Sequence, residues 1–191
     1  SWSALYFAVK FLRNYKSEEI KNLKYEALKH EVELSNLKAQ LNPHFMFNSL
    51  NTLSSLIYEN QENASLFIRE MSDVYRYILE NRDKEVVTLK EEVDFANAYI
   101  YLIRLRFENN LDIISEINSK ALNFKIAPLT LQLLIENAVK HNIISKKYPL
   151  QINIFTEKEI LVVKNKVQLK QTKDYSSKLG LKNIQSRYSF L

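Results

Sequence analysis

Glycine and proline are almost absent from this chain. Its 191 residues include one glycine, Gly180, and three prolines, Pro43, Pro128 and Pro149. Because these residue types supply many of the turns that a β-rich fold needs, their scarcity favours long helices. A proline within such a helical pattern is expected at a cap, at a kink, or where the exposed geometry is useful.

The composition excludes several kinds of site. No cysteine is present, so disulfides, thiolate metal sites and a cysteine nucleophile are excluded, which fits a reducing compartment. Three scattered histidines disfavour a histidine-rich metal site. The net charge is +5, but Lys and Glu are interleaved along most of the chain. A nucleic-acid-binding coiled coil, which needs a dense basic block, is therefore the last of three functional hypotheses, and we expect no nucleic-acid partner.

The N-terminal segment is apolar and aromatic. Residues 2–12 carry one charge, Lys10, and the sequence then turns basic at Arg13 and Lys16. An aromatic end followed by basic residues is typical of the cytoplasmic exit of a transmembrane helix, and a short buried helix is the alternative. We expect residues 1–15 to end a transmembrane helix. The chain would then be a fragment of an integral membrane protein, at the cytoplasmic face of the cell membrane.

A heptad pattern follows, in which apolar residues recur at alternating steps of three and four. It predicts a parallel coiled-coil dimer over residues 17–41. The seam positions are Ile20, Leu23, Ala27, His30, Leu34, Leu37 and Leu41. His30 is expected to set the register of the coil, with a pH-sensing role as the alternative. The next seam positions are His44 and Asn48, so we expect Pro43 to bend or loosen the helix just before the histidine.

The rest of the chain divides at a charged linker. A second helix is predicted over residues 64–81, after a polar break at 59–63, and two antiparallel helices per chain would form a four-helix bundle in a dimer. We therefore assign residues 16–82 to a coiled coil and helical dimerisation region, and residues 83–191 to a second domain.

The second domain mixes helices with strands. Thr88 and Glu91 have capping-box spacing and predict a helix to about residue 107. Further elements are expected as a strand at 111–118, a helix at 129–141, a hairpin at 151–156 and 160–165, and a last helix at 181–190. The predicted fold class is α+β.

Residues 42–51 read NPHFMFNSLN, with His44 beside the proline. A neutral imidazole is a good nucleophile near pH 7, and a break in the helix would make it reachable. The amides of Asn42 and Asn48 could orient a ring nitrogen. The alternative is an ordinary helix kink.

A second candidate cluster lies in the predicted helix at 129–141. Glu136, Asn137, Lys140 and His141 recur three or four residues apart and share a polar face. Oxygen-rich and cationic groups on one face could hold Mg²⁺ and the phosphates that it bridges. A plain solvated helix face is the alternative.

These motifs resemble those of a known family. Residues 42–51 are similar to the NPHFLFNSLN signature of LytS-type sensor histidine kinases, residues 133–142 to their N-box, and residues 180–184 to the end of their glycine-rich box. The resemblance covers about residues 38–191. It implies a dimeric helical bundle followed by a GHKL-type α/β-sandwich that binds ATP, here incomplete at its C-terminus.

The resemblance also implies roles for single residues. His44 would be the phosphoacceptor, and Asn42, Pro43 and Asn48 would orient it. Asn137 would hold Mg²⁺. ATP would be bound by Asn137, Lys140, His141, Asn142, Asn165, Gly180 and Leu181. Phosphohistidine would then pass its phosphoryl group to an aspartate on the receiver domain of a response regulator.

Two departures from the family pattern concern the ATP site. Where the family carries an Asp-x-Gly-x-Gly box, residues 163–167 read VKNKV, and one glycine of the second box is Lys178. Both changes remove glycine's backbone freedom. They favour the second hypothesis, a non-catalytic dimeric scaffold with impaired nucleotide binding, whereas His44 and Asn137 favour a kinase.

Overall fold

The computed structural model describes residues 42–81 and 83–170, with eight further residues nearer the ends: Tyr25, Glu26, Leu28, Lys29, Ile184, Gln185, Tyr188 and Ser189. The chain divides into two compact units, residues 1–44 and 45–191. In the first unit, the four described residues between 25 and 29 are helical. The seam positions of the predicted coiled coil lie outside the described residues, as does the N-terminal segment, and both stay predictions. Of the helices in the described part, none is long and apolar enough to cross a membrane.

Two helices separated by one residue follow, and the first of them begins with the last two residues of the first unit. These are α2 (Pro43–Glu59) and α3 (Gln61–Glu80), and Asn60 between them has extended backbone angles. The Asn60 side chain caps α3 by accepting a hydrogen bond from the Asn63 amide at 2.9 Å. The break therefore falls inside the polar run that predicted it. Near the start of α2, the ring of Phe45 lies 6.4 Å from that of Tyr75, which is in the second half of α3.

The sequence predicted a bend or a loosening of the helix at Pro43. In the structure, helix α2 begins at Pro43. Asn42, just before it, has a φ of 40° and lies outside the helix. Proline is well suited to the first position of a helix, where its missing N–H would have no intrahelical partner in any case. Pro43 is thus the first residue of α2.

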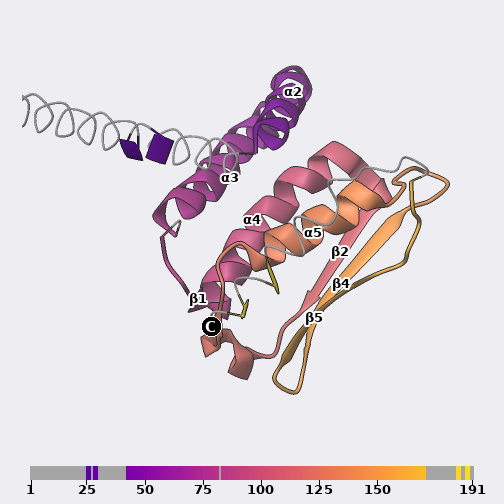
Figure 1. Ribbon diagram of the computed structural model, residues 1–191. Helices are drawn as coiled ribbons and strands as arrows, with labels where there is room; N and C mark the ends of the chain where they lie inside the picture. Colours follow the sequence, from indigo (N-terminus) through magenta and orange to yellow (C-terminus); the bar gives the residue numbers. More distant parts are fainter. Residues whose placement is uncertain are drawn as a thin grey trace, which may run out of the picture. The chain divides into compact units, whose positions relative to one another are not determined.

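Helix α4 (Leu89–Phe107) is the central element of the unit. Its start is fixed by the predicted capping box: the Thr88 amide donates to Glu91 Oε2 at 2.7 Å, and the Glu91 amide donates to Thr88 Oγ1 at 3.2 Å. Buried residues occur on several sides of α4, as expected for a helix covered by neighbours. Figure 1 shows α4 between α3 and α5 (Thr130–His141).

The main sheet has three strands in the order β2 (Leu111–Glu116), β4 (Leu150–Glu157) and β5 (Ile160–Asn165). Strands β4 and β5 form the predicted antiparallel hairpin, whose turn places Lys158 at a φ of 56°. Strand β2 pairs with β4 in parallel, and this pairing was not predicted. Helices α4 and α5 cover one face of the sheet (Figure 1).

A second, smaller sheet has two strands. Strands β1 (Val87–Thr88) and β3 (Lys125–Ile126) pair antiparallel, with the short 3₁₀ helices η1 (Glu108–Asn110) and η2 (Ser119–Asn123) in the connections. Val87, Leu89, Ala121 and Ile126 form a buried cluster there. The mixture of helices and strands confirms an α+β fold; the coiled coil and the finer GHKL details stay predictions.

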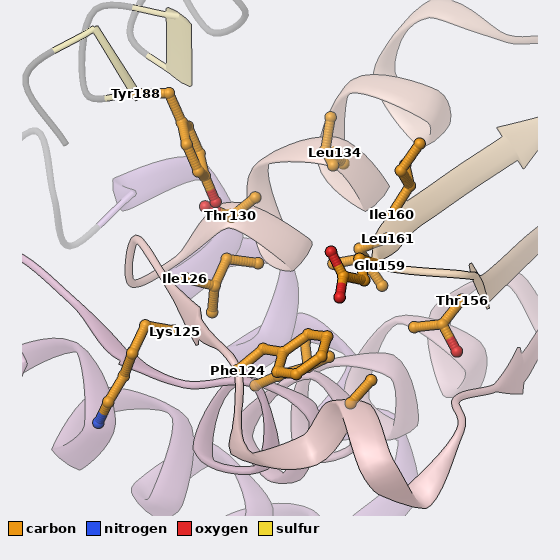
Figure 2. Close-up of a pocket in the computed structure, with 12 residues that line it drawn as sticks. Phe124, Lys125, Ile126, Thr130, Leu134, Thr156, Glu159, Ile160, Leu161 and Tyr188 are labelled. Carbon is orange, nitrogen blue, oxygen red and sulfur yellow. The ribbon is translucent and has the colours of Figure 1, made fainter.

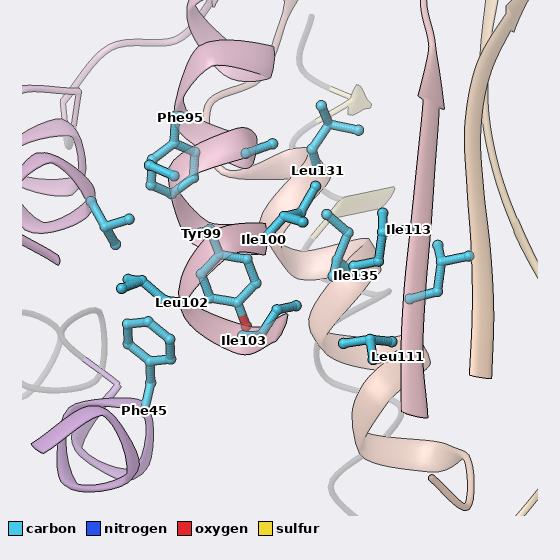
Figure 3. Packing of buried hydrophobic residues seen from close by; sticks show 14 of the residues in the cluster. Phe45, Phe95, Tyr99, Ile100, Leu102, Ile103, Leu111, Ile113, Leu131 and Ile135 are labelled. Atoms are coloured by element: carbon cyan, nitrogen blue, oxygen red, sulfur yellow. The ribbon is translucent and has the colours of Figure 1, made fainter. Parts of the chain in front are cut away.

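The larger core is continuous from α2 to the sheet. Figure 3 shows Phe45 of α2 near Tyr99 and Leu102 of α4, and Leu131 and Ile135 of α5 directed toward strand β2. The rings of Phe45 and Tyr99 have centroids 5.1 Å apart. Side chains on both sides of the predicted boundary at residues 82 and 83 thus belong to one cluster, and the domain division proposed from the sequence stays a prediction.

The capping box predicts a pH-dependent contribution to stability. Hydrogen bonds from the Thr88 side chain and backbone lower the pKa of Glu91, with Lys84 and Lys125 adding to the effect. Because the folded-state pKa lies below its ordinary value of 4.5, the stabilisation is present above that pH and is lost as the pH falls through the folded value.

We expect Thr88→Ala to lower the free energy of unfolding by about 1 kcal/mol at pH 7, and by less at pH 3.5, in urea titrations. The control Ser65→Ala, which alters an exposed hydroxyl inside α3, should show no such pH trend. A cost for Thr88→Ala that is equal at both pH values would contradict this account.

Candidate active site

The polar face predicted on residues 129–141 belongs to α5. Leu131, Ile135 and Ala138 are buried against the core, whereas Lys140 is exposed and Asn137 is half-buried. The helical spacing that separated an apolar stripe from a polar face is therefore correct. Glu136 and Lys140 both interact with other residues of the structure.

Two side chains on this face have buried polar atoms that lack partners. Asn137 Nδ2 and His141 Nε2 are shielded from solvent, and neither forms a hydrogen bond within the described part of the chain. They lie four residues apart on α5, so they share one side of the helix. A buried polar atom without a partner costs free energy, and such atoms are expected where a ligand completes the hydrogen bonding. Asn137 and His141 thus fit a site that takes a polar ligand.

Asn142 has a different environment from its neighbours. It is 4% exposed, its Nδ2 donates to the Ala138 carbonyl at 2.8 Å, and its Oδ1 accepts from the Gln168 amide at 2.6 Å. Both ends of the amide are therefore bound to the backbone. The sequence grouped Asn142 with the nucleotide-facing residues, but its side chain holds the segment that follows β5.

That segment lies along the last turn of α5. The Ile143 amide donates to the Gln168 carbonyl at 2.7 Å, and the Lys170 amide donates to the His141 carbonyl at 3.1 Å. Lys170 Nζ also donates to the carbonyl of Lys140 at 2.9 Å, which places a cation at the C-terminus of the helix. Residues 166–170 are thus fixed by hydrogen bonds at the end of α5 that carries Asn137 and His141.

Asn165 ends strand β5 just before this segment. Its Nδ2 donates to the Lys166 carbonyl at 2.9 Å, so the side chain shapes the local turn. The structure therefore brings the end of β5 and the end of α5 together, as a shared site requires. The other two predicted contacts, Gly180 and Leu181, lie outside the described residues.

The candidate nucleophile lies in the first turn of α2. His44 is exposed and follows Pro43, the first residue of the helix. Asn48, one turn further along α2, is partly exposed, and Asn42 precedes the helix with its left-handed backbone. All three interact with other residues of the structure. An exposed imidazole at a helix start is accessible to a second reactant.

A cavity of about 420 Å³ lies at the opposite end of α5. Figure 2 shows its lining: Phe124, Ile126 and Leu134 with Thr130, Glu159 and Tyr188 around them. Most of the side chains in the complete lining of the cavity are apolar. The cavity is thus separate from the polar end of α5 that carries Asn137 and His141.

The sequence did not identify the group that fixes the start of α5. Glu92 on α4 has no exposed surface and accepts hydrogen bonds from the Leu129 and Leu131 amides at 3.0 and 2.9 Å. Glu91 next to it was recognised by its capping-box spacing. Glu92 had no comparable local signal, because its partners are 37 and 39 residues further along the chain.

Comparison with known proteins places these features in a family context. Residues 32–111 match the family model for histidine kinases. The chain is also 33% identical over 129 residues to proteins named sensor histidine kinase/phosphatase LytS from Staphylococcus aureus strains MRSA252 and Mu50. The matched part is 68% of this chain and 22% of each relative, so the chain spans about a fifth of their length.

Asn137 of α5 and Asn142, which directly follows the helix, are expected to contribute unequally to stability. We expect Asn142→Ala to lower the free energy of unfolding by about 1–3 kcal/mol, because the part-buried Gln168 amide loses its acceptor. Asn137→Ala should cost well under about 1 kcal/mol, since the buried amide nitrogen that it removes has no hydrogen-bond partner among the described residues.

Thermal and urea unfolding of the two variants side by side would measure the difference. An equal loss of stability in both would contradict the assignment of Asn142 to structure and Asn137 to ligand binding.

Proposed function

Because the chain belongs to the LytS-type histidine kinases, which act as sensors in two-component signalling, we propose that it is a kinase core that autophosphorylates on His44 from Mg·ATP. Histidine kinases use ATP and usually Mg²⁺. The observation that carries the proposal is a pair of buried atoms on the polar face of α5, Asn137 Nδ2 and His141 Nε2, which have no hydrogen-bond partner in the described part of the chain.

His44 would act as the nucleophile. The neutral ring nitrogen attacks the γ-phosphorus of ATP, a nitrogen–phosphorus bond forms, the bond to the bridging oxygen of the β-phosphate breaks, and ADP leaves. The ring gives up its N–H proton to solvent, which the exposure of His44 permits. Such a transfer depends mainly on positioning and on neutralising charge, so the chain's task is to present the imidazole and to hold the nucleotide.

Helix α5 would supply the nucleotide-binding groups. In this proposal the Asn137 amide oxygen is a ligand for Mg²⁺, which neutralises phosphate charge when bound. Within the described ranges no three His, Asp or Glu side chains are grouped to hold a metal ion. This fits an ion bound through few protein ligands, because Mg²⁺ commonly keeps its waters and takes phosphate oxygens. Lys140 and His141 would face the phosphates, with Asn165, Gly180 and Leu181 completing the ATP site.

Asn142 enters the proposal differently from its neighbours. Its hydrogen bonds to the Ala138 carbonyl and the Gln168 amide keep residues 166–170 against α5. We propose that it shapes the nucleotide site through this segment, and does not contact ATP with its own side chain.

A second candidate function rests on the same segment. Residues 165–170 contain no glycine, and Asn142 and Lys170 fix them by hydrogen bonds. A loop held in this way could prevent nucleotide entry. The chain would then be a non-catalytic dimeric scaffold, and nucleotide binding separates the two functions.

We further propose that the chain forms a homodimer through α2 and α3. Phe47, Leu50 and Ile57 lie on one side of α2 and are 62%, 46% and 55% exposed, and Ile68 and Leu79 of α3 are similarly open. Large apolar side chains gathered on a helix face mark an interface. A second copy that packs its own α2 and α3 there would complete a four-helix bundle.

The other partners follow from the sensor function. The phosphoryl acceptor would be an aspartate on the receiver domain of a response regulator. Because the chain spans 22% of its relatives, attachment to the membrane through an N-terminal part and a place at the cytoplasmic face stay proposals for the whole protein. No nucleic-acid role is proposed.

Replacing one residue of the apolar face should weaken dimerisation. We expect Phe47→Glu to raise the dimer dissociation constant at least about tenfold in analytical ultracentrifugation, because a charge would be buried in the interface. Ser55→Glu, an exposed position on another side of α2, is the matched control. Unchanged dimerisation in Phe47→Glu would place the interface elsewhere.

Phosphoryl transfer tests the proposed reaction. With γ-labelled Mg·ATP, the chain should acquire an acid-labile, alkali-stable label that His44→Gln abolishes and His30→Asn retains. Asn137→Ala should reduce labelling at least about a hundredfold, since it removes the proposed Mg²⁺ ligand. A folded dimer that binds no nucleotide would support the scaffold instead.

A further inference from the structure

The hydrogen bonding of Glu92 connects three helices at one buried carboxylate. Oε1 accepts from the Leu131 amide, and Oε2 accepts both from the Leu129 amide and from Tyr77 Oη at 2.9 Å. These donors come from the start of α5 and from α3, while Glu92 itself is on α4. Figure 1 shows that α4 lies between the other two. The carboxylate therefore contacts the helices on both sides of α4.

The start of α5 depends on this carboxylate. Leu129 occupies the N-cap position with a left-handed φ of 65°, and its apolar side chain provides no cap. A bulky residue rarely adopts this conformation unless its surroundings hold it there. Glu92 binds the Leu129 and Leu131 amides, which the helix cannot satisfy internally, and a negative charge at a helix N-terminus is also favourable. Glu92, on the neighbouring helix α4, thus acts as the N-terminal cap that Leu129 cannot provide.

Tyr77 links this cap to the position of helix α3. Its hydroxyl donates to Oε2, and its ring stacks on Phe95 of α4 with centroids 4.2 Å apart. Burial and the nearby Glu92 raise the pKa of Tyr77, so the hydroxyl stays protonated and remains a donor. A displacement of α3 that withdrew the hydroxyl would leave a fully buried carboxylate with one donor fewer, which is unfavourable.

We propose that Glu92 is a positioning residue that sets the placement of α5 according to the position of α3, through the hydroxyl of Tyr77. The inference rests on the proposed function, because α5 carries Asn137 and His141, while α3 follows the helix whose first turn carries His44. Asn137 follows Leu131 by six residues, which is about 9 Å along the helix. A change at the start of α5 would therefore move the proposed ligand for Mg²⁺.

The test compares two tyrosines of α3. Tyr77→Phe removes only the hydroxyl that binds Glu92 and keeps the ring on Phe95. Tyr75→Phe removes a buried hydroxyl that has no hydrogen-bond partner among the described residues. By amide hydrogen exchange in the full chain without nucleotide, Tyr77→Phe should speed exchange of the Leu129 and Leu131 amides at least about tenfold, whereas Tyr75→Phe should change it less than about twofold.

Two further measurements distinguish a coupling between α3 and α5 from a general loss of stability. The side-chain amide signal of Asn137 in NMR spectra should shift in Tyr77→Phe and in Glu92→Gln. Adding Tyr77→Phe to Glu92→Gln should change exchange little further, because both act through one carboxylate. If Glu92→Gln does not fold, the comparison of Tyr77→Phe with Tyr75→Phe decides alone.

Equal exchange in the two tyrosine variants, or an unchanged Asn137 signal in Tyr77→Phe, would overturn the proposal. All of these readings are made without ATP. A failure of Mg·ATP binding in the unmodified chain would instead count against the kinase function and leave the coupling intact.

Discussion

A carboxylate with no exposed surface has to be satisfied by donors, and Glu92 meets that requirement by drawing helices α3 and α5 onto α4. The apolar core could tolerate small shifts between these helices, because dispersion and burial have little directional preference. Hydrogen bonds to the carboxylate do have such a preference, and they hold the start of α5 in a left-handed turn that Leu129 would not favour alone. The placement of the polar face of α5 therefore depends on an interaction some nine or more ångströms from it along the helix.

Local patterns predicted much of this fold. The capping box of Thr88 and Glu91, the polar break before α3 and the β4–β5 hairpin each depend on residues close together in sequence, and each is present. The parallel pairing of β2 with β4 was not predicted, because it joins strands about 39 residues apart and neither strand encodes its neighbour. Pro43 was expected to bend or loosen a helix, and in the described residues it is the first residue of α2, a position that suits proline.

For the candidate site, the sequence predicted which residues share a helix face, but not the contacts that each of them makes. Spacing alone placed Asn137 and His141 together on α5, and the structure adds that a polar atom of each is buried with no hydrogen-bond partner among the residues it describes. Spacing could not distinguish them from Asn142, whose hydrogen bond to Gln168 joins residues 26 positions apart. Glu92 illustrates the same limit, since a glutamate early in a helix normally indicates solvent exposure. A buried role becomes visible only once the backbone donors of a distant segment are located.

The central claim is that the C-terminal half of α5 binds Mg·ATP. It can be tested by titrating the ¹⁵N-labelled chain with ATP in the presence and absence of Mg²⁺ and following its NMR signals. The account predicts saturable shifts centred on residues 137–141, with Mg²⁺ required for the full shift of the Asn137 side-chain amide. Shifts confined to the cavity around Thr130 and Leu134, or no shifts at all, would contradict it.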